Sequence, residues 1–337
     1  MGSSTVMEAP AGRVTVTLHH EPVLRDRTVE LWTPPRARVV VDGTVGRAGH
    51  SLTLLSRNPD VRLIAVDRDP DAVAFVERRF VGFGDRALVR HGSYADLPDI
   101  LQADGIERVD GILLDLGVSS PQLDDPARGF TFRHDAPLDL RFDPTSGPTA
   151  AEWLAQVDED VLVRVLREYG EEPNAFRVAR AILDAHHEQP LRTTGMLRSA
   201  VAGVAGRGGR HREPVDKALA RVFQAIRIVV NRELDELDRF LANLRDLLNP
   251  GGRIVILSFH SLEDRRVKHV FQDASRPCVC PPELPVCACG GERAWLAPLA
   301  KRPLVPTDAE VVANPRARSV RLRAAERIVA GGERITR

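Results

Sequence analysis

A glycine-rich loop follows an early apolar run and has an acid at its start. Residues 39–51 read VVVDGTVGRAGHS, in which Asp42 stands directly before three glycines spaced three residues apart. A phosphate-binding P-loop requires lysine followed by Ser or Thr after its last glycine, but here that place is taken by His50. The spacing also differs from the GxGxxG of dinucleotide sites, and Asp42 would repel a pyrophosphate. The loop therefore favours a ligand with a cationic end.

Two further acids stand at or near the ends of later apolar runs. Asp67 ends the run 61–67, and Asp115 lies in the run 109–117. If these runs are parallel strands, their carboxyl ends meet at one edge of a sheet, where ligands bind. An acid about 20 residues past such a loop accepts hydrogen bonds from ribose hydroxyls. Adenosine with a cationic amino-acid tail describes S-adenosylmethionine, so these residues favour a methyltransferase. Another nucleotide-binding enzyme and a chance arrangement remain the alternatives.

The elements that would hold these acids alternate regularly over the first 120 residues. The runs 38–42, 61–67, 87–92 and 109–117 have the length and composition of buried strands, and segments with helical spacing lie between them. Such alternation requires right-handed crossovers and a parallel sheet covered on both faces. We therefore predict an α/β fold with a doubly wound parallel sheet.

A long loop and a block of helices interrupt this alternation. Residues 119–148 are rich in Pro, Asp and Gly and show no apolar period, and helical patterns without strands continue to the strand 253–260. We predict a discontinuous methyltransferase domain of residues 1–143 and 216–337, with an inserted helical domain of residues 144–215.

Charge and hydropathy limit the classes of partner that this sequence favours. The chain of 337 residues has 47 Lys and Arg and 47 Asp and Glu, so a polyanion would have to meet a local basic patch. Such patches occur at 198–212, 265–269 and 316–327. No apolar run approaches the roughly 18 residues of a membrane span, and the N-terminus lacks the pattern of a signal peptide. We therefore expect a cytoplasmic protein that does not insert into membranes.

The cysteines all lie in one short segment, CVCPPELPVCACG. Four are too few and too close together for the disulfide framework of a secreted protein. Four thiolates are able to hold zinc, but C-x-C pairs are tighter than the usual spacing of zinc ligands. We therefore expect reduced thiols and no metal, with structural zinc as the alternative. The four residues are Cys278, Cys280, Cys287 and Cys289.

Several long motifs extend this interpretation over nearly the whole chain. They are VDGTVGRAGHS, DGILLDLGVSSPQLDDPARGFTF, PLDLRFDP, FQAIRIVVNREL, NPGGRIVILSFHSLEDRRVKHVF and NPRARSVRLRAAER. Together they resemble the small-subunit ribosomal RNA methyltransferase H family. The resemblance implies a class I S-adenosylmethionine-dependent methyltransferase fold and methylation of the exocyclic N4 of a cytidine in the decoding region. The implied partner is small-subunit ribosomal RNA, within the assembled small subunit.

The resemblance also implies a set of cofactor contacts, part of which the strand-end acids and the loop had already indicated. Tyr94 and Gln122 rest mainly on the resemblance. The family loop typically has glycine where Ala48 stands, and the helical lobe departs further from the family than the cofactor half does. The methyltransferase activity is thus better supported than the target base. The predicted cofactor-binding residues are Asp42, Gly46, Ala48, Gly49, His50, Asp67, Tyr94, Asp115 and Gln122.

The predicted catalytic residues are Asp115 and the turn Ser119, Ser120 and Pro121, which lie where other amino-methyltransferases have their acid-or-asparagine, proline, aromatic motif. Asp115 would accept a hydrogen bond from the N4 amine or only from the cofactor.

Three further residues are predicted to contact the substrate. Phe130 and Phe132 would stack on an unstacked cytosine, although core packing is the commoner use of such a pair. His260 would contact RNA, with a structural role as the alternative. Ser261 is predicted as the N-cap of the helix that follows, with Asp264 at the capping-box distance.

Overall fold

The computed structural model describes residues 6–7, 16–17, 22–205, 214–278, 280–281, 284, 288–289 and 291–329. The chain divides into two compact units. The first, which we call the sheet unit, comprises Met1–Gly117 and Glu236–Arg337. The second, the helical unit, comprises Val118–Asp235.

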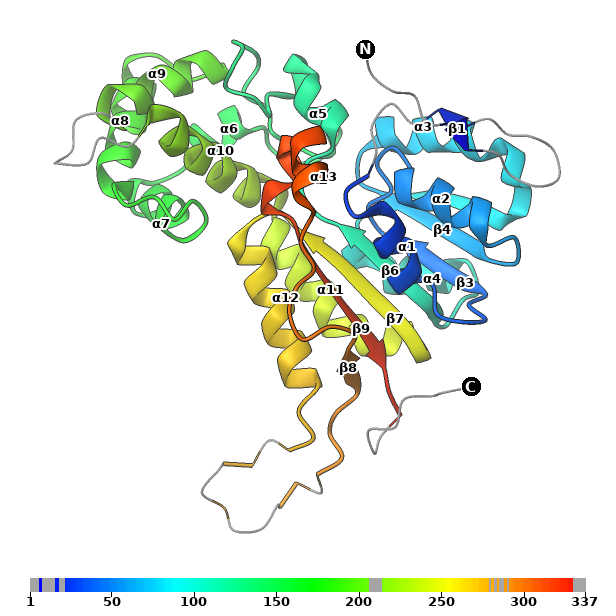
Figure 1. Cartoon of the computed structure of the whole chain (residues 1–337). Coiled ribbons are helices and arrows are strands. Elements are labelled where there is room, and N and C mark those ends of the chain that lie inside the picture. The colour runs from blue at the N-terminus through cyan, green and yellow to red at the C-terminus, as the bar shows by residue number, and fades with distance from the viewer. Residues whose placement is uncertain are drawn as a thin grey trace. The chain divides into compact units, whose positions relative to one another are not determined.

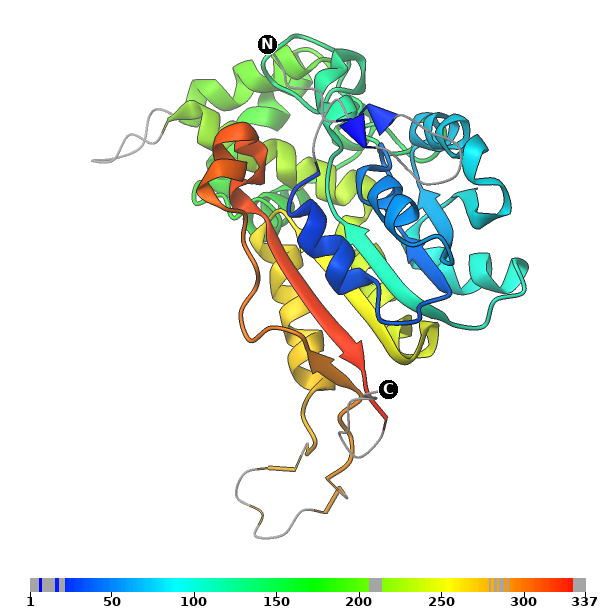
Figure 2. The same cartoon turned by 45° about the vertical axis from the view of Figure 1, so that its right-hand side comes forward.

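The sheet unit is built on seven strands in the order β5-β4-β3-β6-β7-β9-β8 (Figures 1 and 2). The five strands β5, β4, β3, β6 and β7 are parallel, which confirms the predicted α/β fold. Strand β9 runs antiparallel to both of its neighbours, β7 and β8, so the sheet is mixed at this edge. The strands are β3 (Val39–Asp42), β4 (Arg62–Asp67), β5 (Ala87–His91), β6 (Val109–Asp115), β7 (Leu248–Ser258), β8 (Leu296–Pro298) and β9 (Arg321–Arg327), and two short strands, β1 (Val6–Met7) and β2 (Val16–Thr17), pair separately.

Helices cover both faces of this sheet because successive strand residues point to opposite sides. Val41, Ile112 and Ile254 pack in one apolar cluster with helices α4, α11 and α12. Val40 and Leu113 pack in a second cluster, with helices α1, α2 and α3. The helices of the sheet unit are α1 (Arg25–Trp32), α2 (Gly49–Arg57), α3 (Pro70–Phe80), η1 (Val81–Arg86), η2 (Tyr94–Asp96), α4 (Leu97–Ala103), most of α11 (Glu233–Leu247), α12 (Ser261–Ala274), α13 (Asp308–Ala313) and η4 (Pro315–Ser319).

The helical unit has an apolar core of its own. It is wider than the predicted insertion of residues 144–215, because side chains on both sides of that range enter this core. Phe130 and Leu138 come from the loop before it, and Ile226 comes from α10 after it. Its helices are α5 (Ser120–Asp124), η3 (Pro126–Arg128), α6 (Ala150–Leu154), α7 (Glu159–Glu168), α8 (Ala175–Glu188), α9 (Thr194–Ala205) and α10 (Val215–Asn231). No helix in the described part of the chain is long and apolar enough to cross a membrane.

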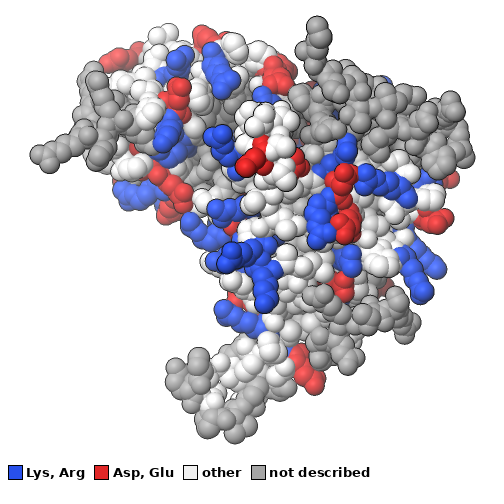
Figure 3. All heavy atoms as spheres, in the orientation of Figure 1, with Lys and Arg blue, Asp and Glu red and all other residues white. Residues whose placement is uncertain are grey.

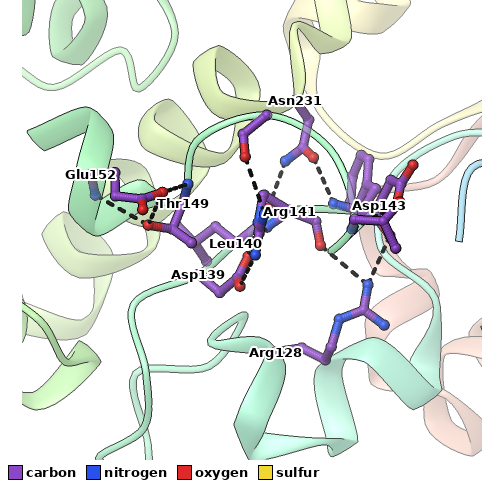
Figure 4. A network of polar contacts seen from close by, with 11 residues as sticks. Arg128, Asp139, Leu140, Arg141, Asp143, Thr149, Glu152 and Asn231 are labelled. Carbon is purple, nitrogen blue, oxygen red and sulfur yellow. Dashed lines mark hydrogen bonds and ion pairs between the residues drawn. The ribbon is translucent and has the colours of Figure 1, made fainter.

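A polar network fixes the PLDLRFD motif within the helical unit (Figure 4). The side-chain amide of Asn231 donates to the Leu140 carbonyl at 2.7 Å and accepts from the Phe142 amide at 2.7 Å. Arg128 donates to the Phe142 carbonyl at 2.8 Å. Leu140 is buried with a φ of 63°, in the left-handed region. The buried amide thus satisfies backbone groups that an irregular loop leaves without partners.

Candidate active site

The candidate site lies where the strand order reverses. Strand β3 is followed along the chain by β4 on one side, whereas β6 lies on its other side. The two central strands stay linked beyond the end of β3, because the Gly43 amide donates to the Leu113 carbonyl at 2.9 Å and the Asp115 amide donates to Thr44 Oγ1 at 2.6 Å. Ligands of open α/β sheets bind at such a reversal, at the carboxyl ends of the strands. Asp42 and Asp115 therefore stand at the position expected for a ligand site.

The glycine-rich loop turns sharply between β3 and α2. Gly46 has a φ of 49° and Ala48 a φ of 62°, both in the left-handed region. A Cβ on Gly49 would lie 2.9 Å from Cγ of Pro22, so the backbone there fits only glycine without movement. The left-handed conformation at Ala48 costs an alanine roughly 1 kcal/mol that glycine avoids. This cost is a physical reason for the glycine that the resemblance led us to expect at that position.

Buried hydrogen bonds hold Asp42. Its carboxylate accepts from Ser51 Oγ at 2.6 Å and from the Thr44 amide at 3.2 Å. Burial raises the pKa of Asp42 to about 6, although the hydrogen bond from Ser51 acts in the opposite direction. Sequence reasoning missed both Thr44 and Ser51, and only the position of Ser51 in the first turn of α2 could have suggested its role. The chain thus keeps a carboxylate where burial disfavours its charge, which suits a cationic ligand.

Asp67 has a similar environment at the end of β4. It accepts from the Gly46 amide at 2.7 Å and from the Asp69 amide at 2.9 Å. Burial raises the pKa of Asp67 to about 6 against these two hydrogen bonds. Asp67 therefore links the second strand end to the glycine-rich loop.

His50 and Asp115 lie near each other, and each has a buried polar atom. His50 is 5% exposed, and its Nε2 lies 3.7 Å from Asp115 Oδ2, which is too long for a hydrogen bond. Among the described residues, Asp115 Oδ1 and both ring nitrogens of His50 have no hydrogen-bond partner. A buried acceptor without a partner costs about 1–3 kcal/mol, so these atoms fit a polar ligand that satisfies them. This observation supports a cofactor or substrate at the strand ends.

Tyr94 and Gln122 differ in their surroundings. Tyr94 is 9% exposed and its ring meets Phe240 edge to face, with ring centroids 5.8 Å apart. In the helical unit, Oε1 of Gln122 accepts from the Ser119 amide at 2.9 Å, which closes a capping box at the start of α5. Ser119 is the N-cap, and Ser120 and Pro121 form the first turn of α5. These contacts order the turn that follows Asp115. The catalytic role of Ser119, Ser120 and Pro121 stays a prediction.

The start of α12 differs from the prediction. The N-cap is His260 and not Ser261, and the capping partner is Glu263 and not Asp264. Glu263 Oε2 accepts from the Phe259 amide at 2.8 Å, and His260 Nε2 lies 3.2 Å from Glu263 Oε1. Asp264 points elsewhere, because Arg321 and Arg323 hold it at 3.0 and 2.7 Å. The side chains of His260 and Glu263 are 8% and 4% exposed, and neither ring nitrogen of His260 has a hydrogen-bond partner among the described residues. Neither the structural role nor the RNA contact of His260 is decided by this geometry, and the RNA contact stays a prediction.

The family of this chain follows from its similarity to known proteins. The model of the MraW methylase family matches residues 17–328. This chain belongs to that family. Membership confirms the resemblance inferred from the motifs, and with it S-adenosylmethionine-dependent methyltransferase activity.

Curated relatives in the MraW methylase family match along most of their length. A protein of Desulfosudis oleivorans named "Ribosomal RNA small subunit methyltransferase H" is 45% identical over 314 residues, which cover 93% of this chain and all of the relative. One of the same name from Bordetella pertussis is 49% identical over 290 residues, covering 86% of this chain and 78% of the relative. Among solved structures, a putative rRNA methylase from Clostridium thermocellum aligns with a TM-score of 0.40 at 11% identity, covering 92% of this chain and 100% of that one.

The two loop phenylalanines pack differently within this MraW family member. Phe130 is 8% exposed, and its ring stacks on Phe142 with ring centroids 5.7 Å apart. Phe132 is half-buried and tilted against Phe223, with ring centroids 5.4 Å apart. Core packing therefore accounts for Phe130, and the proposed stacking on a base is better suited to Phe132.

We expect Phe130→Ala to lower the free energy of unfolding by about 3 kcal/mol, because it removes a buried ring and leaves a cavity. Phe176→Ala is the matched control, since Phe176 is 53% exposed on α8 and its loss should change stability by less than about 0.5 kcal/mol. Urea denaturation measures the free energy of unfolding of both variants.

For Phe132→Ala we expect lower turnover at saturating RNA. Wild-type turnover in the Phe130 and Phe132 variants alike would contradict base stacking by this pair.

Proposed function

We propose that this protein transfers the methyl group of S-adenosylmethionine to the exocyclic N4 of a cytidine in the decoding region of small-subunit ribosomal RNA. Membership of the MraW methylase family supports it, as do relatives named "Ribosomal RNA small subunit methyltransferase H". The observation that carries the proposal is the buried Oδ1 of Asp115, which has no hydrogen-bond partner in the described part of the chain. This acceptor stands at the strand end where the ligand of such a sheet binds.

The amine of cytosine is a poor nucleophile because its lone pair is delocalised into the ring. When bound, S-adenosylmethionine supplies an electrophilic methyl group on a sulfonium. Asp115 would accept a hydrogen bond from the N4 amine, favour its pyramidal form and aim it at the methyl carbon. Asp67 would accept from the ribose hydroxyls, and Asp42 would hold the loop and oppose the positive charge of the cofactor. Most of the rate acceleration would then come from positioning.

The turn after Asp115 and the loop phenylalanines would receive the base. Ser119, Ser120 and Pro121 would shape the turn, Gln122 would hold its start, and Phe132 would support a cytosine turned out of the RNA stack. A flipped base is needed because N4 in a stacked or paired cytosine does not reach a buried methyl group.

The test is transfer of radiolabelled methyl from S-adenosylmethionine to small ribosomal subunits that lack this modification, followed by mass spectrometry of the nucleosides. N4-methylcytidine at a single position is the expected product. Another methylated base would favour a paralogue that acts on a different nucleic-acid amine. Calorimetric binding of the cofactor without any transfer would favour a non-catalytic assembly factor. The names of the curated relatives favour neither alternative.

We further propose that the substrate is the assembled small subunit, in the cytoplasm. The same assay with protein-free RNA tests this step. We expect faster methyl transfer to the assembled subunit, because the subunit presents the RNA in a fixed conformation. Equal rates on both substrates would contradict it.

Helix α12 carries exposed basic side chains suited to RNA phosphates. Figure 3 shows Lys and Arg gathered over the part of the sheet unit that contains α12. Arg265 and Lys268 are exposed on this helix, and Arg316 and Arg318 are exposed on η4, which leads into β9. The basic segment 316–327 is only partly available, because Arg323 is held by the buried Asp264. Within the basic patch 198–212, Arg207, Arg210 and Arg212 lie outside the described residues.

We expect the double substitution Arg265→Ala with Lys268→Ala to weaken RNA binding at all sequences alike. Removing two phosphate contacts should reduce the slope of log affinity against log salt by about 2. Filter binding over a salt series measures this slope. Arg78→Ala, which removes an exposed arginine on α3, is the control and should leave the slope unchanged. An unchanged slope in the double variant would place the RNA elsewhere.

A further inference from the structure

Three cysteine side chains meet in the segment that connects α12 to β8. The sulfur atoms of Cys278, Cys280 and Cys289 all lie within 4.8 Å of one another. Cys278 Sγ and Cys289 Sγ are 3.5 Å apart, and none of the three forms a disulfide. Eleven positions along the chain separate Cys278 from Cys289, so the backbone must fold back on itself to bring them together. The fourth cysteine of the motif, Cys287, lies outside the described residues.

This segment, residues 275–294, which we call the cysteine loop, leaves and rejoins the sheet unit at one place. The Trp295 amide donates to the Ala274 carbonyl at 2.9 Å, and the Arg293 amide donates to the Pro277 carbonyl at 3.1 Å. Helix α12 and strand β8, at whose ends the loop begins and finishes, lie side by side in Figures 1 and 2. None of the described residues of the loop is buried. Apolar packing therefore does not account for its fold, and a segment without a core requires another constraint.

The distances between the sulfur atoms fit a tetrahedral metal. Because each Zn–S bond is about 2.3 Å, two sulfurs of one zinc site lie roughly 3.8 Å apart. The distance of 3.5 Å between Cys278 and Cys289 is close to this value and too long for a disulfide bond. The Cys280 amide donates to Cys278 Sγ at 3.4 Å, and a hydrogen bond to sulfur favours the thiolate form that binds metals.

We propose that the cysteine loop binds one Zn²⁺ ion through the thiolates of Cys278, Cys280 and Cys289. The ion replaces the missing apolar core, and its binding free energy stabilises the folded loop. This site is not part of the methyl-transfer site. Trp295 pairs with Ile328 just past the end of β9, and β9 is antiparallel to β7, so the loop base lies at the amino end of β7. Asp42, Asp67 and Asp115 lie at the carboxyl ends of the parallel strands.

Metal analysis of the untagged full chain, purified without chelator, tests the proposal. We expect one zinc per chain by mass spectrometry. Cys278→Ser and Cys289→Ser should each reduce the zinc content more than tenfold, whereas Glu292→Gln, an exposed position in the same loop, should retain it. Replacing zinc with Co²⁺ should give thiolate-to-cobalt charge-transfer absorption, which Cys278→Ser removes. Circular dichroism shows that each variant is folded.

A second readout separates a structural ion from one needed for chemistry. Chelation should speed proteolytic cleavage within the cysteine loop about tenfold or more, because the loop opens without the ion. Methyl transfer should persist. Three results would overturn the proposal: less than one-tenth zinc per chain together with no cobalt charge-transfer band, full zinc content in both Cys→Ser variants, or bound iron in place of zinc.

Discussion

Asp115→Asn should lower kcat for methyl transfer by about 100-fold or more, the loss typical of removing one group that stabilises a transition state. Asparagine keeps the shape of the side chain, but its amide oxygen is a weaker acceptor and its NH₂ group repels the donor it faces. The buried Oδ1 of Asp115 has no other partner among the described residues, so no second contact compensates for the change. Single-turnover rates on small subunits measure the effect.

Whether Asp115→Asn lowers kcat or weakens cofactor binding shows which molecule Asp115 contacts. If it accepts from the N4 amine, the variant binds S-adenosylmethionine normally in calorimetry while kcat falls. If it contacts only the cofactor, the dissociation constant rises and kcat recovers at saturating cofactor. A kcat within about threefold of wild type, with normal cofactor binding, would rule out both roles.

Asp110→Asn is the matched control for this substitution. Asp110 lies on the same strand, β6, five positions earlier, and its carboxylate accepts from the Arg38 amide at 2.8 Å and from Asn249 at 2.8 Å. These contacts lie at the amino ends of β3 and β6, away from the carboxyl ends where the candidate site lies, and an asparagine oxygen retains part of them. We expect kcat to change by no more than about twofold.

The strand-end acids were predictable because two strong local signals coincide there. A run of β-branched residues followed by glycines specifies a strand and a turn with few alternatives, and a parallel sheet brings the ends of such strands together. Asp42, Asp67 and Asp115 follow from that geometry alone. The contacts of Ser51 and Thr44 do not, because a hydroxyl in a loop or first helical turn has many equivalent local uses.

The elements that were missed depend on packing between distant segments. Strand β9 reads RLRAAER, in which arginines mask the alternation, and its buried side chains gain their place only against β7. The capping pair His260 and Glu263 displaced the expected Ser261 because the helix begins one residue earlier than the local pattern favours. The bounds of the helical unit were set by Phe130 and α10, whose apolar faces find partners only in the folded core.

The raised pKa of Asp42 predicts how stability depends on pH. Its carboxyl is 2% exposed and has a folded pKa of about 6 against an ordinary value of 3.8. Between these values the folded state binds more protons than the unfolded state, so the free energy of unfolding falls as pH rises from about 4 to about 6 and stays low above that. At 1.36 kcal/mol for each unit of pKa, the cost at neutral pH is on the order of 3 kcal/mol.

Asp42→Asn should therefore be more stable than wild type at pH 7.5 without cofactor, by up to about 3 kcal/mol, and equally stable near pH 4. Urea denaturation at the two pH values measures the difference. Asp99→Asn, at an exposed position on α4, controls for the substitution itself and should show no difference that changes with pH. A stability difference for Asp42→Asn that is the same at both pH values would contradict the linkage.

The same substitution should weaken cofactor binding at pH 7.5, because the ionised carboxylate opposes the positive charge of S-adenosylmethionine. A cationic ligand lowers the pKa of a nearby carboxyl, so wild-type binding should tighten as pH rises through about 6 and release a proton near that pH. Calorimetry in buffers of different ionisation enthalpy counts that proton, and Asp42→Asn should release less. The acid that destabilises the empty fold would then be the one that the cofactor requires, a trade between stability and function typical of binding sites.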